Sequence, residues 1–368
     1  MTFRFLGNKT KFLLPILEQI SLAEQPSKQT RVVDLFCGTA VISRGLRQLG
    51  YSVVANDFLL SCVINAKAQL LSRGAPRFDC LIQYENALLG DVPQLSLFAT
   101  PYTKVISYLN SLSGREGFFF REFSPAGIPS NGEASRMYFS PENARRIDAV
   151  RETIRDWRQR GWLTDVEHAV LLHDLMSASN RIANTTGTYG FYLNHWSKSA
   201  LQPFELKPKE FLDGHTGHTV VLGDAIETAA KTPAPIFYLD PPYTKRQYAA
   251  YYHLLETLAY EDEPELLGKT GSRGWKHKAS DFCHKLRAPK TMKRLLESID
   301  ANYIFVSYSE DGHITHTQMM DLLNERGDIK HIELNNSRYL SNGSEKGTAL
   351  KERLYKVTTR QAFYNRQI

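Results

Sequence analysis

The feature that most constrains this chain is the stretch Ile236-Phe-Tyr-Leu-Asp-Pro-Pro-Tyr243, an apolar run that enters a double-proline turn. The pattern predicts a buried strand that must stop at Pro241 and Pro242, because proline has no N–H to donate to a neighbouring strand. The turn then holds Asp240 and Tyr243 at the carboxyl end of the strand, the edge where open α/β sheets bind ligands. A carboxylate, the Pro241 carbonyl and an aromatic ring together suit a planar base that carries an amino group. An ordinary turn that closes a strand is the alternative interpretation.

The first part of the chain has the pattern of a nucleotide-binding sheet. A short apolar strand ends at Asp34 and is followed by a glycine turn at Gly38 and a helix, and a second strand ends at Asp57, 23 residues after Asp34. A carboxylate at about this spacing is typical of one that binds ribose hydroxyls. Only Gly38 and Gly45 remain of the three glycines that surround a dinucleotide pyrophosphate, so S-adenosylmethionine suits the pattern better than NAD.

Two further segments add candidate contacts to the same site. A glycine loop leads through Lys9 into a helix, and a helix start with a lysine suits an anionic ligand, although a plain capping segment has the same pattern. A strand at 220–222 is followed by Gly223 and Asp224, and the Asp224 carboxylate is suited to accept a hydrogen bond from an adenine amino group. His215 and His218 have no further ligand cluster beside them, so no metal is expected.

Composition agrees with a large cytoplasmic enzyme and favours a polyanionic partner. The chain has 368 residues and a net charge of +6, and its pI is about 9.0, although such an excess is also common in proteins that bind no polyanion. The four cysteines show neither zinc-site nor disulfide-scaffold spacing, which indicates a reducing compartment. No apolar run resembles a signal core or a membrane span, so we expect a cytoplasmic location and no membrane contact.

Residues 96–215 differ from the flanking parts, because polar loops there alternate with helices. The helix expected from 141 to about 160 has an apolar stripe and an arginine stripe, and the arginines suit either phosphates or solvent. The segment 184–196 is rich in hydroxyls, amides and aromatics, which suit contacts with nucleic acid as well as a tightly packed turn. The apolar stripe consists of Ile147, Val150, Ile154 and Trp157, and the arginine stripe of Arg151, Arg155 and Arg158.

Basic residues interleaved with tyrosines follow the double-proline turn. This pattern suits a channel for nucleic acid, although a flexible solvated loop has the same composition. The candidates for contact with DNA are Lys245, Arg246, Arg273, Lys276 and Lys278.

Taken together, these segments resemble the Dam-like, alpha-group DNA adenine-N6 methyltransferases. The resemblance rests on a series of sequence motifs in a fixed order, and within the insertion only residues 184–196 contribute to it. It implies an α/β, Rossmann-like S-adenosylmethionine methyltransferase sheet with an inserted, mainly helical DNA-recognition region. The catalytic domain would comprise residues 1–95 and 216–368, and the target-recognition region residues 96–215. The motifs are Phe5-Leu-Gly-Asn-Lys-Thr-Lys11, Asp34-Leu-Phe-Cys-Gly38, Asp57, Gly223-Asp224 and Asp240-Pro-Pro-Tyr243.

The resemblance also implies a reaction and the residues that carry it. The methyl group of S-adenosylmethionine would pass to the N6 amino group of an adenine that has been flipped out of duplex DNA. The implied catalytic residues are Asp240, Pro241, Pro242 and Tyr243. The implied cofactor contacts are Lys9, Asp34, Phe36, Cys37, Gly38, Asp57 and Asp224.

Other functions remain open at this point. The alternatives are an RNA adenine or DNA cytosine-N4 amino-methyltransferase, and a nucleic-acid-binding relative that has lost catalysis. In the families resembled, an initial Asp such as Asp240 favours adenine in DNA, and intact Gly38 and Asp57 argue against lost catalysis. We expect protective modification in a restriction-modification or phage context, with a separately encoded restriction endonuclease as a partner. The sequence determines neither the recognition site nor the oligomeric state.

Overall fold

The computed structural model describes residues 4–84, 100–214, 217–336, 350–360 and 362. The chain forms two compact units, each built from three stretches of sequence. Residues 1–7, 59–95 and 249–277 belong to the unit that contains most of the inserted region, whereas the sequence-based division assigned them to the catalytic domain. That functional division stays a prediction. The sheet unit comprises Asn8–Phe58, His215–Tyr248 and Lys278–Ile368, and the helical unit comprises Met1–Gly7, Leu59–Gly214 and Ala249–His277.

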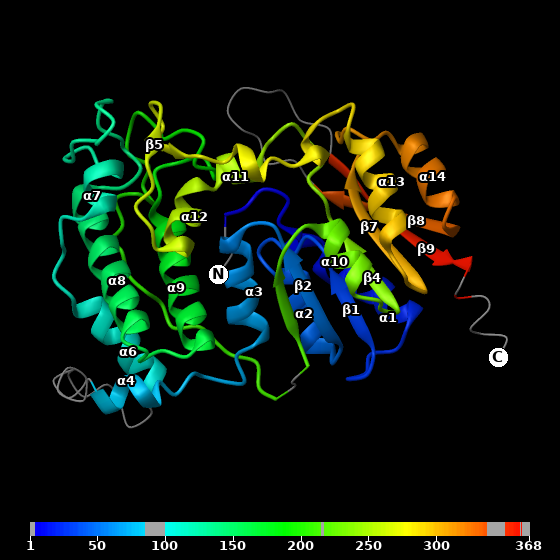
Figure 1. The fold of residues 1–368 in the computed structure, drawn as a ribbon, viewed down its shortest axis with the longest axis horizontal. Helices are drawn as coiled ribbons and strands as arrows, with labels where there is room; N and C mark the ends of the chain where they lie inside the picture. Colours follow the sequence, from blue (N-terminus) through cyan, green and yellow to red (C-terminus); the bar gives the residue numbers. More distant parts are fainter. Residues whose placement is uncertain (1–3, 85–99, 215–216, 337–349, 361, 363–368) are drawn as a thin grey trace. The chain divides into compact units, whose positions relative to one another are not determined.

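A mainly parallel seven-stranded sheet forms the centre of the sheet unit (Figure 1). The strand order is β3-β2-β1-β4-β7-β9-β8, and β9 runs antiparallel to both of its neighbours. This architecture confirms the predicted α/β, Rossmann-like sheet. The strands are β1 (Arg31–Asp34), β2 (Ser52–Asp57), β3 (Thr219–Leu222), β4 (Ile236–Leu239), β7 (Tyr303–Ser309), β8 (Gly327–Asn336) and β9 (Leu350–Thr359).

The central strands β4 and β7 form at largely apolar stretches of the sequence. Every residue of β4 and β7 is buried, as expected for parallel strands that are covered on both faces. β4 ends at Leu239, immediately before Asp240 and the two prolines. The last two strands of the chain form an antiparallel pair, in which Ile332 of β8 lies opposite Leu354 of β9.

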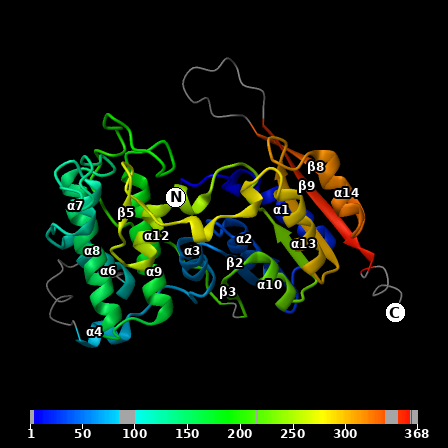
Figure 2. The same ribbon diagram turned by 45° about the horizontal axis from the view of Figure 1, so that its top comes forward.

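Helices cover both faces of this sheet. On one face α10, α13 and α14 lie side by side (Figures 1 and 2), and their apolar side chains share a core with alternate strand residues such as Val33, Phe237 and Ile304. The buried residues of α1 and α2 do not belong to that core, because these helices pack on the opposite face. The helices are α1 (Leu13–Ala23), α2 (Val41–Leu49), α10 (Ala225–Lys231), α13 (Ala288–Ser298) and α14 (His316–Asn324), with short 3-10 helices at Lys9–Phe12 and Asp281–Cys283.

In the helical unit, α9 contacts α3, α8 and α12. The predicted apolar stripe of α8 is buried, and within residues 100–214 the regular elements are the helices α6, α7, α8 and α9, in agreement with the expected helical region. Across the described ranges, every helix is too short or too polar to span a bilayer. The elements are α3 (Leu60–Leu70), α4 (Asp79–Tyr84), α6 (Pro101–Ser111), α7 (Phe118–Phe123), α8 (Pro141–Gln159), α9 (Asp165–Ile182), α12 (His253–Tyr260), β5 (Leu266–Leu267) and β6 (Ser272–Arg273). Two short helices, α11 (Tyr248–Tyr251) and Lys276–Lys278, lie where the chain passes between units.

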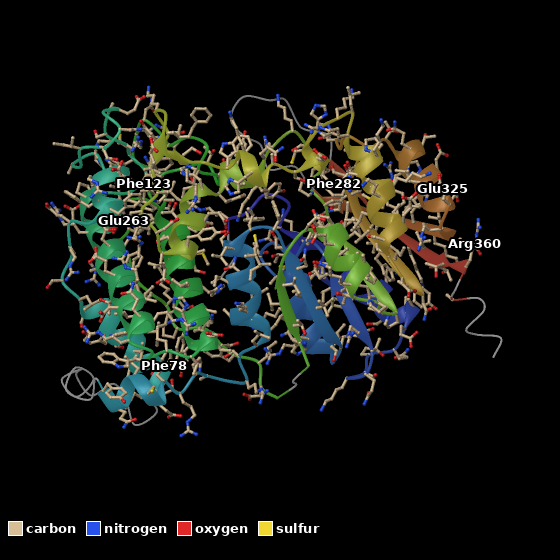
Figure 3. The ribbon with its side chains drawn as sticks, viewed as in Figure 1. Phe78, Phe123, Glu263, Phe282, Glu325 and Arg360 are labelled. Carbon is tan, nitrogen blue, oxygen red and sulfur yellow. The ribbon has the colours of Figure 1, made fainter. Side chains whose placement is uncertain are left out.

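The arginine stripe of α8 binds carboxylates of its own unit. Arg151 is fully buried, and its guanidinium lies 3.6 Å from Glu263, a residue labelled in Figure 3. Arg155 approaches the same carboxylate at 3.9 Å, and Arg158 forms an ion pair with Asp165. Arg151 is therefore not part of a solvated face, because its charge is used within this unit's own fold.

Candidate active site

The carboxylates of the predicted site gather where neighbouring parallel strands end. Asp34 is the last residue of β1, Asp57 is the last residue of β2, and Asp240 follows β4 directly. The strand ends lie side by side, since Asp34 is opposite both Tyr238 of β4 and Ala55 of β2. Three carboxylates from three strands therefore meet the same edge of the sheet, as the sequence pattern predicts.

Asp240 is held by an ion pair with Lys9, and this pair includes a further carboxylate, Glu352. The Lys9 Nζ lies 2.8 Å from Asp240 Oδ1 and 2.7 Å from Glu352 Oε1. The side chains are only 3%, 15% and 12% exposed for Lys9, Asp240 and Glu352, respectively. Within the part of the chain that the structure describes, no group donates a hydrogen bond to Asp240 Oδ2. One oxygen of this carboxylate is thus available to accept a hydrogen bond from a substrate.

Burial controls the protonation of this cluster. It raises the pKa of Asp240 to about 7, a rise that the Lys9 charge opposes and the Glu352 charge reinforces. Burial also disfavours the Lys9 ammonium, but the Asp240 and Glu352 carboxylates outweigh this effect and raise the pKa of Lys9 above its ordinary value. Because one ammonium is shared by two carboxylates, it neutralises only part of their charge, and Asp240 titrates near neutral pH.

The double-proline turn places Tyr243 beside the same cluster. The backbone N–H of His313 donates to the Tyr243 carbonyl at 2.8 Å. The ring of Tyr243 meets the Tyr308 ring edge-to-face, with 5.9 Å between centroids, and the Lys9 Nζ lies 5.8 Å from the Tyr243 centroid. Tyr243 is only half-buried, so part of its ring surface remains for stacking.

The glycine turn that follows β1 is hydrogen-bonded to the end of β2. Gly38 has a φ of 51°, in the left-handed region that favours glycine, and its N–H donates to Asp57 Oδ2 at 2.9 Å. The Cys37 N–H donates to the Asn56 carbonyl at 2.9 Å. Burial raises the pKa of the Cys37 thiol well above its ordinary value, so this side chain stays neutral. These bonds fix the loop against the carboxylate that is predicted to bind ribose.

Asp34 and Asp224 have very different surroundings. Asp34 is buried, and the Ser43 hydroxyl donates to its Oδ2 at 2.5 Å, whereas its Oδ1 has no hydrogen-bond partner among the described residues. Burial raises the pKa of Asp34 to about 7, and the hydrogen bond from Ser43 opposes that rise. Asp224 caps α10, because its Oδ1 accepts hydrogen bonds from the N–H groups of Ile226 and Glu227 at 2.9 and 3.2 Å.

The groups at this edge fit S-adenosylmethionine. The buried Asp34 Oδ1 is an acceptor that a cationic ligand would satisfy, and S-adenosylmethionine carries a sulfonium and an amino group. Asp57 offers a carboxylate where ribose hydroxyls are expected. Half-buried Phe36, which meets Phe282 edge-to-face at 5.5 Å, offers an apolar ring (Phe282 is labelled in Figure 3). The role of each residue toward the cofactor stays a prediction, including that of Lys9. The described residues form no group of three or more metal-binding side chains.

The predicted DNA-binding cations have unequal surroundings. Lys245, Arg246 and Lys276 are exposed, and Lys278 is half-buried, with its Nζ 5.9 Å from the Phe58 ring centroid. None of these features excludes contact with phosphates, which stays a prediction.

Arg273 forms an ion pair with a carboxylate of its own unit. Two of its nitrogens lie 2.9 Å from the Asp262 carboxylate oxygens, and its guanidinium lies 4.7 Å from the Tyr260 ring centroid. A phosphate would have to share or displace Asp262 to bind this guanidinium.

The segment 184–196 contains a packed turn. The Asn184 amide donates to the carbonyls of Leu193 and His195, both at 3.1 Å, and it accepts from the Ser197 N–H at 3.0 Å. Phe191 nevertheless remains 78% exposed, so the turn presents an aromatic ring at its surface.

Sequence reasoning missed three polar residues of this site: Ser43, Ser307 and Glu352. The Ser307 hydroxyl donates to Glu352 Oε1 at 2.7 Å, and both side chains are buried. Ser307 is a polar residue in the largely apolar strand β7, and Glu352 lies in β9, where its burial follows from the pairing of β9 with β7. Their connection to Lys9 depends on long-range pairing that no local pattern contains.

Comparison with known proteins agrees with this geometry. The chain matches the family model for D12 class N6 adenine-specific DNA methyltransferases over residues 5–321. Modification methylase StsI from Streptococcus sanguinis is 33% identical over 96% of this chain and 51% of that protein. Type II methyltransferase M.FokI from Planomicrobium okeanokoites is 33% identical over 88% of this chain and 47% of that protein. Type II methyltransferase M.NlaIII from Neisseria lactamica is 29% identical over 93% of each chain.

This chain spans about half the length of the StsI and FokI proteins. The family match nevertheless covers all the catalytic, cofactor-binding and DNA-binding candidates, from Lys9 to Lys278. The chain belongs to the D12 class N6 adenine-specific DNA methyltransferases.

Proposed function

We propose that this chain transfers a methyl group from S-adenosylmethionine to the N6 amino group of adenine in double-stranded DNA at a specific site. The observation that carries the proposal is the Asp240 carboxylate, with Oδ1 held by Lys9 and Oδ2 available, beside a half-buried tyrosine ring. Membership of the D12 class supports adenine as the base and S-adenosylmethionine as the methyl donor.

The residues of the turn activate the substrate amino group. The adenine amino nitrogen is a poor nucleophile, because its lone pair is delocalised into the ring. Hydrogen bonds from the amino group to Asp240 Oδ2 and to the Pro241 carbonyl favour a pyramidal nitrogen, whose lone pair can attack the methyl group. S-adenosylmethionine, when bound, supplies that methyl group on a positively charged sulfur. Asp240 therefore acts by accepting a hydrogen bond that strengthens as positive charge develops on nitrogen.

The adenine must leave the double helix before it can reach this turn. Extrusion costs a few kcal/mol of lost stacking and pairing. The exposed part of the Tyr243 ring offers a surface on which the extruded base can stack, and the contact with Tyr308 holds that ring in place. We assign recognition of the target sequence to residues 96–215.

The type II relatives suggest the biological context. We propose that the chain protects DNA from a restriction endonuclease that is encoded separately, and that it acts in the cytoplasm where that DNA is found. M.NlaIII, which this chain matches over 93% of that protein's length, is named as a type II methyltransferase and supports this context.

Product analysis tests the proposal. The purified chain is incubated with isotopically labelled S-adenosylmethionine and either duplex DNA or RNA, and the nucleosides are resolved by mass spectrometry. We expect N6-methyladenine in DNA alone. Methylated cytosine, or label in RNA alone, would contradict the assignment of the substrate.

A further inference from the structure

Glu352 is a buried carboxylate on strand β9, and a buried charge is costly unless an opposite charge or a hydrogen-bond donor lies beside it. Strand β9 pairs with β7 so that Glu352 is opposite Ser309, and the Glu352 side chain is 12% exposed. The residue lies beyond residues 5–321, the part of the chain that the family model matches. No role in catalysis is therefore assigned to it by the family match.

The contacts of Glu352 converge on one oxygen. Its Oε1 accepts a hydrogen bond from the Ser307 hydroxyl at 2.7 Å and lies 2.7 Å from the Lys9 Nζ. The same Nζ lies 2.8 Å from Asp240 Oδ1. Ser307 thus orients Glu352, Glu352 orients the lysine, and the lysine holds one oxygen of Asp240.

This arrangement restrains a side chain that otherwise has many conformations. A lysine has four rotatable side-chain bonds, so an ion pair with Asp240 does not by itself determine which carboxylate oxygen the ammonium contacts. Glu352 attracts the Lys9 ammonium from a second direction and so favours its contact with Asp240 Oδ1 over a contact with Oδ2. Oδ2 then remains for the substrate amino group.

We propose that Glu352 is a positioning residue for methyl transfer, which acts through Lys9 to keep the Asp240 carboxylate oriented with Oδ2 available to the substrate. The proposal rests on the proposed methyl transfer to an amino group. With Glu352, the residues that orient Asp240 include Lys9, near the start of the sequence, and a residue of β9.

The charge of Glu352 gives the proposal a second consequence. Among the described residues, the Asp240 carboxylate interacts electrostatically with Lys9, Glu352, Asp34 of β1, Tyr238 of β4 and Tyr243. Arg246 acts on the neighbouring Tyr243. Removing the Glu352 charge takes away a negative charge that lies beside the Lys9 ammonium and that raises the pKa of Asp240. The pKa of Asp240 should then fall, and a rate that depends on ionised Asp240 should reach half its plateau at lower pH.

Two variants test this inference. Glu352→Gln keeps the shape and an oxygen acceptor but removes the charge, and Glu352→Ala removes both. Single-turnover methyl transfer is measured from pH 5.5 to about 9, with affinities for cofactor and DNA measured in parallel. Glu333→Gln, an exposed carboxylate on the adjacent strand β8, is the matched control.

We expect Glu352→Gln to move the midpoint of the pH profile down by about one unit, because one pKa unit is the usual scale of such charge effects. Glu352→Ala should lower the plateau rate about 100-fold while both affinities change by less than about threefold, since misplacement of a reacting group can cost that much. Glu333→Gln should match the wild type in every respect.

Two results would overturn the proposal: an unchanged midpoint and plateau in both variants, or a loss that appears equally in cofactor affinity at every pH. The rate is measured on whichever nucleoside the wild type methylates. A wrong assignment of the base would therefore leave the test of Glu352 intact.

Discussion

Lys9 carries one positive charge between two buried carboxylates, so the edge of the sheet keeps a net negative charge. Asp34, which is also buried at this edge, adds to it, and its pKa, like that of Asp240, is raised to about 7. A negative edge suits a cofactor whose reacting sulfur is positively charged. The same charges make the site sensitive to pH in the neutral range.

We predict that S-adenosylmethionine binds about tenfold more tightly at pH 8 than at pH 6, because a carboxylate with a pKa near 7 is ionised only at the higher pH. Protonation of Asp34 removes the charge that attracts the cation. Calorimetry at both pH values measures the effect, and S-adenosylhomocysteine, which lacks the sulfonium charge, should show a smaller difference. Asp34→Asn should reduce the pH dependence. Equal pH dependence for both ligands would show that the sulfonium charge is not involved.

Asp57 provides a second prediction about a single residue. Asp57→Ala should weaken cofactor binding by about 2–3 kcal/mol, roughly 30- to 150-fold, because two hydrogen bonds to ribose hydroxyls are lost. It also removes the acceptor of the Gly38 N–H. DNA affinity should change little, and Asp328→Ala, an exposed carboxylate of β8, serves as the control. An unaltered cofactor affinity would place the ribose elsewhere.

Helices α1 and α2 approach each other at a glycine. A Cβ on Gly45 would lie 2.7 Å from Leu17 Cδ1 and 2.9 Å from Leu13 Cδ1. Gly45→Val should therefore reduce the free energy of unfolding by about 1–3 kcal/mol through overpacking. Gln48→Val, which places the same side chain at an exposed position of α2, is the control in a denaturant titration. Equal stability of the two variants would argue against close packing of these helices.

The elements most accurately predicted from sequence are those whose signals are local. β4 is a continuous apolar run, and Asp240 with its two prolines marks where it ends. The same signals placed Asp34 and Asp57 at the sheet edge, because parallel strands align their carboxyl ends. The contact between Lys9 and Asp240 was not predictable in this way, since it joins residues 231 positions apart (240 minus 9). The role of Glu352 in the site could not be predicted either, because its burial depends on how β9 pairs with β7.

At the scale of the whole molecule, the net charge of +6 is consistent with a DNA partner, but it does not identify the cations that bind phosphates. Arg273 shows the difficulty: its sequence neighbourhood is strongly basic, yet its guanidinium pairs with Asp262. Partner choice of this kind depends on tertiary packing, and composition cannot reveal it. Salt dependence of DNA binding distinguishes such internal cations from those that bind DNA phosphates.

Replacing Lys276 and Lys278 together by Ala should therefore flatten the dependence of log affinity on log salt, by up to about 0.9 for each phosphate that the variant no longer neutralises. Arg273→Ala should leave that slope nearly unchanged and reduce stability instead, because it breaks an internal ion pair. The control is the double variant Lys231→Ala and Lys293→Ala, whose ammonium groups pair with Glu227 and Glu325. A slope that falls for Arg273→Ala alone would assign phosphate binding to Arg273.

The most direct test of the central claim is single-turnover methyl transfer by Asp240→Ala, with cofactor and DNA affinities measured alongside and Asp328→Ala as the control. The variant removes the acceptor of the substrate amino group and leaves the hydrogen bond between Gly38 and Asp57 in place. We predict a rate at least about a thousandfold below wild type, since the missing hydrogen bond is strongest in the transition state, with affinities largely retained. Turnover near the wild-type rate, with N6-methyladenine as the product, would contradict the account.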